Sequence, residues 1–150
     1  MVNLKWDKRG QTHIDERMQM DSSHRKGQTS EYMAACWFSD QGWEVFWSNL
    51  GQSSVDFLVV HDNEVKSVQV KSAISTFTKN GSERLRVNLR AGRRKPRRYK
   101  AATFDLLVVC AKDGRIWVIP EKYIPKVTQF TLIGTDSKGF NKWLVRNPQI

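Results

Sequence analysis

The amino-acid sequence predicts an α+β domain in which a mixed central sheet is flanked by helices. One long helical segment is expected near the start, where residues 25–41 carry helix-forming residues and stop before a glycine. Short apolar segments separated by turn residues follow it, which is the pattern of β-strands. The expected order is a helix, four strands, a basic loop and two strands, and this order is typical of the α+β class.

The helix at 25–41 has candidate signals at both ends. Thr29 or Ser30 is the candidate N-cap, and Gly42 is the candidate stop. Because its middle is apolar nearly all round, this helix is expected to be largely buried.

Four strands are expected next, arranged as hairpins. The first three lie at 43–47, 55–62 and 64–78, with Asn63 in a tight turn between the second and the third. Asn80-Gly81 predicts a type I′ turn, because both central residues of that turn need a positive φ. The strand at 82–90 is then the antiparallel partner of the third strand.

The rest of the chain predicts a basic loop at 91–103, two core strands and an irregular tail. The strands lie at 104–112 and 115–120, joined by a turn at Asp113-Gly114, and a brief helix is expected at 120–125. The sequence shows no internal repeat, so residues 1–150 are expected to form one domain. Its segments are an N-terminal arm (1–24), a catalytic core (25–72), a hairpin with the basic loop (73–100) and the remaining strands with the C-terminal region (101–150).

Composition narrows the classes of partner. The 150 residues carry a formal net charge of +10, and this favours a polyanion such as nucleic acid. An anionic membrane surface would need a basic amphipathic helix, which the sequence lacks. With no apolar run of membrane length and no secretory signal, an intracellular, cytoplasmic location of bacterial type is expected. Cys36 and Cys110 are expected to be buried thiols, and two cysteines make no zinc site.

Three residues in the middle of the chain carry the candidate chemistry. Gln69 and Lys71 lie two apart on one expected strand, so their side chains share a face, and Val68 and Val70 take the opposite, core-facing side. Asp56 opens the neighbouring antiparallel strand and can stand beside them. Each residue alone is an ordinary strand-end or surface residue, and only the joint pattern indicates a site. A carboxylate and an amide oxygen suit Mg²⁺, and a lysine beside them can stabilise charge on a phosphoryl group.

These residues resemble a known motif. Asp56, followed thirteen residues later by Gln-Val-Lys at 69–71 and preceded by a helix with Glu31, is similar to the PD-(D/E)XK, or restriction-endonuclease-like, nuclease superfamily. The run KGQTSEYMA at 26–34 resembles the first helix of two of its groups. They are the cyanobacterial group I intron-encoded homing endonucleases and, more distantly, the archaeal Holliday junction resolvases.

The resemblance implies a catalytic set of Glu31, Asp56, Gln69 and Lys71, in which the first three residues hold Mg²⁺ or Mn²⁺. The sequence departs from the motif at Val55, which replaces the proline, and at Gln69, which replaces an acidic residue. The second departure removes one negative charge from the metal site.

A basic hairpin and loop are the candidate DNA contacts. In the strand at 82–90, three arginines and an asparagine alternate with apolar residues, so that one face is polar. A two-stranded ribbon of this kind can enter a major groove, where arginine suits guanine and asparagine suits adenine. The loop cations suit phosphates, which position DNA without specifying its sequence. The full set is Ser75, Thr76, Thr78, Lys79, Arg84, Arg86, Asn88, Arg90, Arg93, Arg94, Lys95, Arg97, Arg98 and Lys100.

The sequence and the resemblance together predict a site-specific double-strand DNA endonuclease of the intron-homing type, which hydrolyses phosphodiester bonds with Mg²⁺. Cutting both strands needs two sites, so a homodimer or a homotetramer is expected, with no membrane or small-molecule cofactor as a partner. Two alternatives remain open. One is a Holliday junction resolvase or another structure-specific nuclease, and the other is a nucleic-acid-binding module without catalysis.

Overall fold

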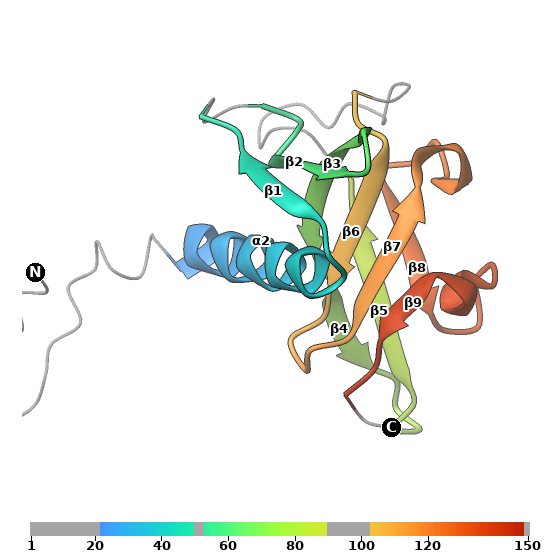
Figure 1. Ribbon diagram of the computed structural model, residues 1–150. Helices are drawn as coiled ribbons and strands as arrows, with labels where there is room; N and C mark the ends of the chain where they lie inside the picture. Colours follow the sequence, from blue (N-terminus) through green and yellow to red (C-terminus); the bar gives the residue numbers. More distant parts are fainter. Residues whose placement is uncertain (1–21, 50–52, 90–102, 149–150) are drawn as a thin grey trace, which may run out of the picture.

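The computed structural model describes residues 22–49, 53–89 and 103–148, and among these residues a single α-helix covers one face of a mixed β-sheet (Figure 1). The main sheet has six strands in the order β1-β2-β3-β6-β7-β9, and a three-stranded sheet has the order β4-β5-β8. The strands are β1 (Glu44–Trp47), β2 (Phe57–His61), β3 (Glu64–Ser72), β4 (Ile74–Phe77), β5 (Glu83–Asn88), β6 (Leu106–Cys110), β7 (Ile116–Pro120), β8 (Gln129–Ile133) and β9 (Leu144–Arg146). The predicted α+β class with a mixed central sheet is confirmed, but among the described residues one α-helix flanks this sheet where several helices were expected.

The helix α2 (Ser22–Asp40) begins earlier than expected and packs by one face. Thr29 and Ser30 lie inside it rather than at its cap, and the Thr29 hydroxyl donates a hydrogen bond to the Arg25 carbonyl within the helix. Gly42, with a φ of 87°, follows the helix as predicted. The prediction that this helix is largely buried is wrong, because only Ser30, Ala34, Ala35 and Phe38 are buried within 25–40 and Tyr32 is 59% exposed.

Two core layers lie on opposite faces of the six-stranded sheet. One fills the space between α2 and the sheet, and it includes Ala34, Phe38, Val68 and Val70. The other layer fills the space between the two sheets, and its residues come from alternate positions of the same strands and from β5 and β8. They are Leu85, Val87, Leu107, Val109, Trp117, Ile119, Phe130 and Leu132. The six-stranded sheet is therefore the middle of three layers, so a side chain on it faces either α2 or the second sheet.

The β2–β3 hairpin and the parallel pairing of β3 with β6 form the centre of the molecule. Asp62 and Asn63 have φ values of 44° and 64°, so the tight turn expected at Asn63 is present and has positive φ at both central residues. β3 then pairs with β6 in parallel, while β6 and β7 are antiparallel neighbours. This combination makes the sheet mixed, as predicted.

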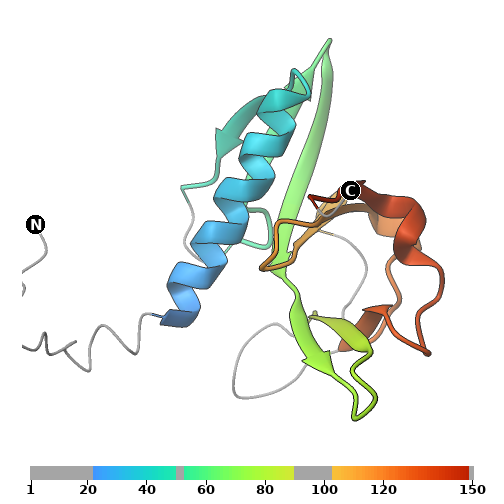
Figure 2. The same cartoon turned by 90° about the horizontal axis from the view of Figure 1, so that it is seen from below.

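The long third strand expected at 64–78 is divided. β3 stays in the six-stranded sheet up to Ser72, and the Ala73 N–H still bonds to the Cys110 carbonyl at 2.9 Å. The chain then bends and β4 pairs with β5 in the second sheet; Figure 2 shows this bend where green gives way to yellow-green. The change of pairing partner, which is a tertiary event, separates the two strands.

The turn at Asn80-Gly81 closes the β4–β5 hairpin in a different form from the one predicted. Gly81 has a φ of 77°, but Asn80 is not among the described residues with positive φ, so the turn is not type I′. The Gly81 N–H bonds to the Thr78 carbonyl and the Thr78 N–H bonds to the Ser82 carbonyl, both at 2.9 Å. This is the pattern of a type I turn followed by a left-handed glycine.

The C-terminal region is more regular than the sequence predicts. β8 joins β5, and β9 joins the edge of the main sheet after the 3-10 helix η2 (Phe140–Trp143). A second short 3-10 helix, η1 (Glu121–Tyr123), confirms the brief helix expected at 120–125. Both cysteines are free, but Cys36 is exposed and only Cys110 is buried as expected. Among the described residues, no helix is both long enough and apolar enough to cross a membrane.

Candidate nuclease site and DNA-contacting surface

The structure brings Asp56, Gln69 and Lys71 together on one face of the main sheet. Phe57 is opposite Val68 in the antiparallel β2–β3 pair, so Asp56, one residue earlier, lies across from Gln69. The Asp56 Oδ2 atom accepts a hydrogen bond from the Val70 N–H at 2.6 Å. Asp56 also bonds to the Gln69 side chain and is attracted by the charge of Lys71.

The face that carries these residues is the one that also carries the second sheet. Gln69 and Lys71 are the parallel partners of Leu107 and Val109, which belong to the core layer between the two sheets. Val70, by contrast, packs in the core layer beneath α2. The strand alternation predicted for residues 68–71 is therefore present.

The electrostatic environment of Asp56 disfavours its negative charge. Burial raises the pKa of this half-buried carboxyl above its ordinary value of 3.8. The hydrogen bond from Val70, the charge of Lys71 and the hydrogen bond with Gln69 all lower the pKa, but together they do not offset the desolvation. A cation bound beside Asp56 would stabilise its ionised form.

Glu31 lies on α2, which covers the opposite face of the sheet. It is half-buried and follows Ser30, whose hydroxyl oxygen is 2.7 Å from the hydroxyl oxygen of Ser72. Ser72 ends β3 directly after Lys71, so Glu31 belongs to the helix segment that crosses this end of the strand. Glu31 can reach the other three residues only around the end of β3, since the sheet lies between them.

The polar face predicted for the strand at 82–90 is present on β5. Leu85, Val87 and Leu89 are buried, whereas Asn88 is exposed and Arg84 and Arg86 are half-buried. Arg84 and Arg86 line a hollow of about 250 Å³ in the outer surface of the second sheet. Within the described residues, the Nε atoms of both arginines are buried without a hydrogen-bond acceptor. Each arginine therefore keeps an unused donor.

Two residues hold these arginines in place, and both are far away in the sequence. The Arg84 Nη2 atom lies 2.6 Å from Asp136 Oδ2, and the Arg86 Nη1 atom donates a long hydrogen bond of 3.5 Å to Gln129. The hydrogen bonds from Arg84 and then Thr131 hold the pKa of Asp136 below its usual value.

The other predicted hairpin residues divide between the two faces of the second sheet. Thr76 pairs with Arg84 and shares the arginine face, but Ser75 pairs with Leu85 and bonds to Glu83 on the opposite face. Thr78 accepts the Ser82 N–H in the turn, and Lys79 is exposed there. The remaining predicted contacts lie outside the described residues. They are Arg90, Arg93, Arg94, Lys95, Arg97, Arg98 and Lys100.

The prediction from sequence missed the third strand of this surface. Gln129 and Thr131 on β8 pair with Asn88 and Arg86 and thereby widen the polar face beyond the hairpin. The signal was present, because QFTLI (129–133) alternates polar and apolar residues, and Phe130 and Leu132 are indeed buried.

Known proteins are similar to this chain in sequence and in fold. No family model matches the sequence. A bacterial homing endonuclease, I-Ssp6803I, has a similar structure, with a TM-score of 0.66 at 23% identity over 82% of this chain and 88% of that one. That similarity establishes a shared fold. Protein 5.3 of Escherichia phage T7 is 33% identical over 94 residues, which are 63% of this chain and 77% of the phage protein. Since the match covers most of the phage protein, the chain belongs to the family of phage T7 protein 5.3.

Proposed function

We propose that this protein is a metal-dependent DNA endonuclease whose site consists of Asp56, Gln69 and Lys71, with Glu31 as a fourth member. The observation that carries the proposal is the β2–β3 register, which sets Asp56 across from Gln69 on the face that Lys71 shares. The fold shared with a homing endonuclease supports the same reaction class. The net charge of +10 supports a polyanionic substrate.

The donor set fits a divalent cation with oxygen ligands, Mg²⁺ or Mn²⁺. Asp56 offers a carboxylate whose pKa is raised by burial, and Gln69 offers an amide oxygen. Among the described residues no three acidic, histidine or cysteine side chains form a group that could hold a metal, so the proposed set relies on the amide oxygen of Gln69 and on Glu31 beside the one carboxylate of Asp56. When bound, the cation supplies Lewis-acid stabilisation of the phosphodiester and an activated water.

Each residue of the chain then has a distinct task. Asp56 and Gln69 hold the cation, and the Val70 N–H fixes the Asp56 carboxylate in its orientation. Lys71 donates to the phosphoryl oxygens, on which negative charge develops during the reaction. Glu31 contributes a second carboxylate from the middle of α2, where the helix crosses the end of β3, and it offsets the charge that Gln69 lacks.

The proposed substrate is a defined site in double-stranded DNA, as in intron homing. The polar outer face of the second sheet supports sequence reading, since the Arg84 and Arg86 side chains line a hollow that is open on that face. The described residues form one proposed nuclease site, so a homodimer or a homotetramer is proposed for cutting both strands. A junction-specific nuclease would rely more on phosphate contacts than on this face.

A second candidate is a DNA-binding protein without catalysis, and Gln69 is the observation that favours it. The neutral amide removes one negative charge from the motif and weakens the hold on a cation. Under this candidate the protein binds DNA through its cationic surfaces and leaves it intact.

Nuclease assays with three substrates separate these candidates. Supercoiled plasmid is incubated with Mg²⁺ or with EDTA, and a randomised linear library and a four-way junction are tested in parallel. The proposal predicts Mg²⁺-dependent cutting of the linear library at one preferred sequence. Preferential cutting of the junction would support the resolvase alternative, whereas binding without any cutting would support the non-catalytic one.

A further inference from the structure

A continuous groove runs from α2 over the end of β3 to the β4–β5 hairpin. One cavity of about 370 Å³ lies at the α2 end, and a second of about 630 Å³ lies at the hairpin end. The two cavities share five lining residues, namely Lys26, Ser72, Ala73, Ala111 and Lys112. Because β3 and β6 are parallel, their carboxyl ends meet at this groove, which is where open α/β sheets commonly bind ligands.

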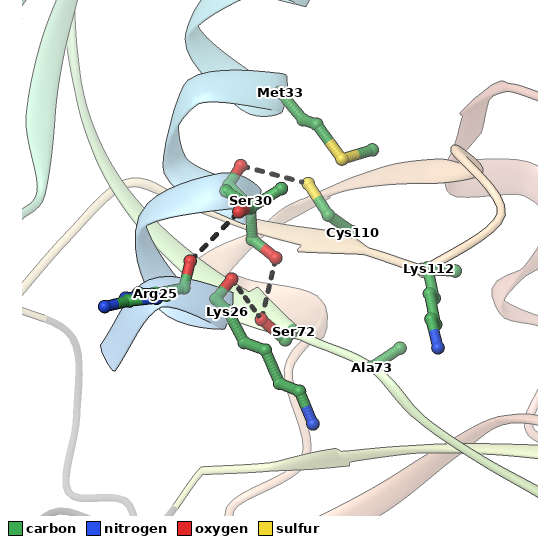
Figure 3. Close-up of a pocket in the computed structure, with 10 residues that line it drawn as sticks. Arg25, Lys26, Ser30, Met33, Ser72, Ala73, Cys110 and Lys112 are labelled. Atoms are coloured by element: carbon green, nitrogen blue, oxygen red, sulfur yellow. Dashed lines mark hydrogen bonds between the residues drawn. The ribbon is translucent and has the colours of Figure 1, made fainter. Parts of the chain in front are cut away.

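The middle of the groove is cationic. Figure 3 shows the Lys26 and Lys112 side chains extending in the same direction on either side of Ala73, and Arg25 lines the α2 end. Burial raises the pKa of the Cys110 thiol to about 12, so this group adds no negative charge to the cavity wall. The α2 cavity is lined by no carboxylate among the described residues.

The two carboxylates at the hairpin end share one buried arginine. Glu83 and Asp113 both bind the buried guanidinium of Arg115, with N–O distances of 2.6 and 2.8 Å. This single guanidinium offsets one of the two carboxylates, and with Arg25, Lys26 and Lys112 the groove lining holds four cations against two carboxylates, a net charge of +2. The matching ligand is an anion, and phosphate groups are the anions that a DNA-binding protein meets.

The hairpin end presents an aromatic ring to solvent. Phe77 lines the second cavity from β4, the edge strand of the second sheet, and it is 71% exposed. Its strand partner is Glu83, so Phe77 faces the groove and not the arginine surface. An exposed ring next to a line of cations is the arrangement with which proteins bind single-stranded nucleic acid, where bases stack on the ring and phosphates follow the cations.

We infer that this groove binds an unpaired DNA strand, with Lys26 and Lys112 on its phosphates and Phe77 stacked on a base. The inference rests on the proposed function only in taking DNA as the ligand. Lys71 directly precedes Ser72 in the groove wall, so a strand held here passes beside the proposed nuclease site. Paired bases are stacked within a duplex and cannot cover Phe77, which makes the groove selective for the unpaired form.

The test is the binding of a short fluorescent single-stranded oligonucleotide in EDTA, measured by anisotropy at several salt concentrations. The logarithm of the association constant falls linearly with the logarithm of the salt concentration, and Lys26→Ala and Lys112→Ala are each expected to make this slope shallower by about 0.7. Phe77→Ala is expected to weaken binding about 5- to 100-fold with an unchanged slope, since stacking releases no counterions. All three side chains lie at the surface, and circular dichroism checks that each variant is folded.

Matched controls carry the same substitutions elsewhere. Lys66→Ala removes a lysine near the opposite end of β3, and Phe46→Ala removes a ring that is 51% exposed on β1. Both controls are expected to bind like the wild type. The inference is overturned if the groove variants bind single strands as the controls do, or if they lose duplex binding to the same extent. Because EDTA prevents cleavage, the result does not depend on whether the protein is a nuclease.

Discussion

The carboxylate of Asp56 accepts a hydrogen bond from the backbone N–H of Val70, with 2.6 Å between the two atoms. This contact ties the residue before β2 to the middle of β3 and orients Asp56 towards Gln69 and Lys71. Since the donor belongs to the backbone, the orientation does not depend on a mobile side chain. The Asp56 carboxylate is therefore held in position before any ligand binds.

Gln69→Glu is expected to strengthen the binding of a divalent cation. A second carboxylate beside Asp56 adds the negative charge that the glutamine lacks, so the Mg²⁺ concentration at half-maximal binding should fall on the order of tenfold. Titration calorimetry with Mg²⁺ measures the change. Gln129→Glu adds the same charge on β8, away from Asp56, and should leave the affinity unchanged. Equal effects of the two substitutions would contradict a local metal site.

Asp56→Asn is expected to raise the free energy of unfolding of the metal-free protein at neutral pH. The pKa of Asp56 is raised above 3.8, chiefly by burial, so the folded state favours the protonated carboxyl. Ionisation costs stability as the pH rises from 3.8 through the folded pKa, and above that pKa the whole cost is present. Asparagine cannot ionise, so its advantage should disappear in acid.

Urea unfolding of both proteins at neutral and at acidic pH measures this difference. Added Mg²⁺ should then stabilise the wild type more than the variant, because a ligand that binds only the folded state raises its stability. A variant that is destabilised equally at both pH values would show that ionisation of Asp56 does not destabilise the folded protein.

Arg86→Ala is expected to relax sequence preference at one or two base pairs. Arg86 lies half-buried on the outer face of the second sheet, where it lines an open hollow, and a bidentate contact to guanine contributes about 1–3 kcal/mol of discrimination. Lys100→Ala, in the basic loop outside the described residues, should instead weaken binding to all sequences by a similar factor. Binding selections on a randomised duplex library distinguish the two. A uniform loss for Arg86→Ala would remove base reading from this residue.

Glu83→Ala is expected to destabilise the fold by about 3 kcal/mol at most, because it breaks a largely buried ion pair. Glu83 links the hairpin to the β6–β7 turn through Arg115, whose side chain is only 8% exposed, and Asp113 remains as a partner. Glu64→Ala removes an exposed carboxylate paired with Lys66 at 3.1 Å, and it should cost about 0.5 kcal/mol or less. Thermal unfolding compares the two, and equal losses would mean that the Arg115 cluster does not hold the hairpin.

The core of the candidate site could be predicted because it depends on local sequence. The alternation of residues 68–71 fixes which side chains share a face, and the tight turn at Asn63 makes the two strands antiparallel neighbours. Together these two features place Asp56 beside Gln69 without knowledge of the rest of the fold. The polar face of β5 was predictable for the same reason.

The features that could not be predicted depend on distant segments. The alternating pattern continues through Ala73, and only the change of pairing from β6 to β5 ends β3 there. The partner of Arg84 lies 52 residues away, at Asp136. The groove joins residues of α2, β3 and the β6–β7 turn, so no sequence window contains both Lys26 and Lys112. Such contacts are set by tertiary packing and not by local periodicity.

The central claim is that Asp56 and Lys71 act in phosphodiester cleavage, and comparison of Asp56→Asn and Lys71→Ala with the wild type tests it most directly. Cleavage of a plasmid that carries the preferred site is measured with Mg²⁺, and duplex binding is measured in EDTA. Both variants should lose cleavage by a factor on the order of 10²–10³ or more and should retain binding. A variant at either position that cuts at the wild-type rate would contradict the assignment.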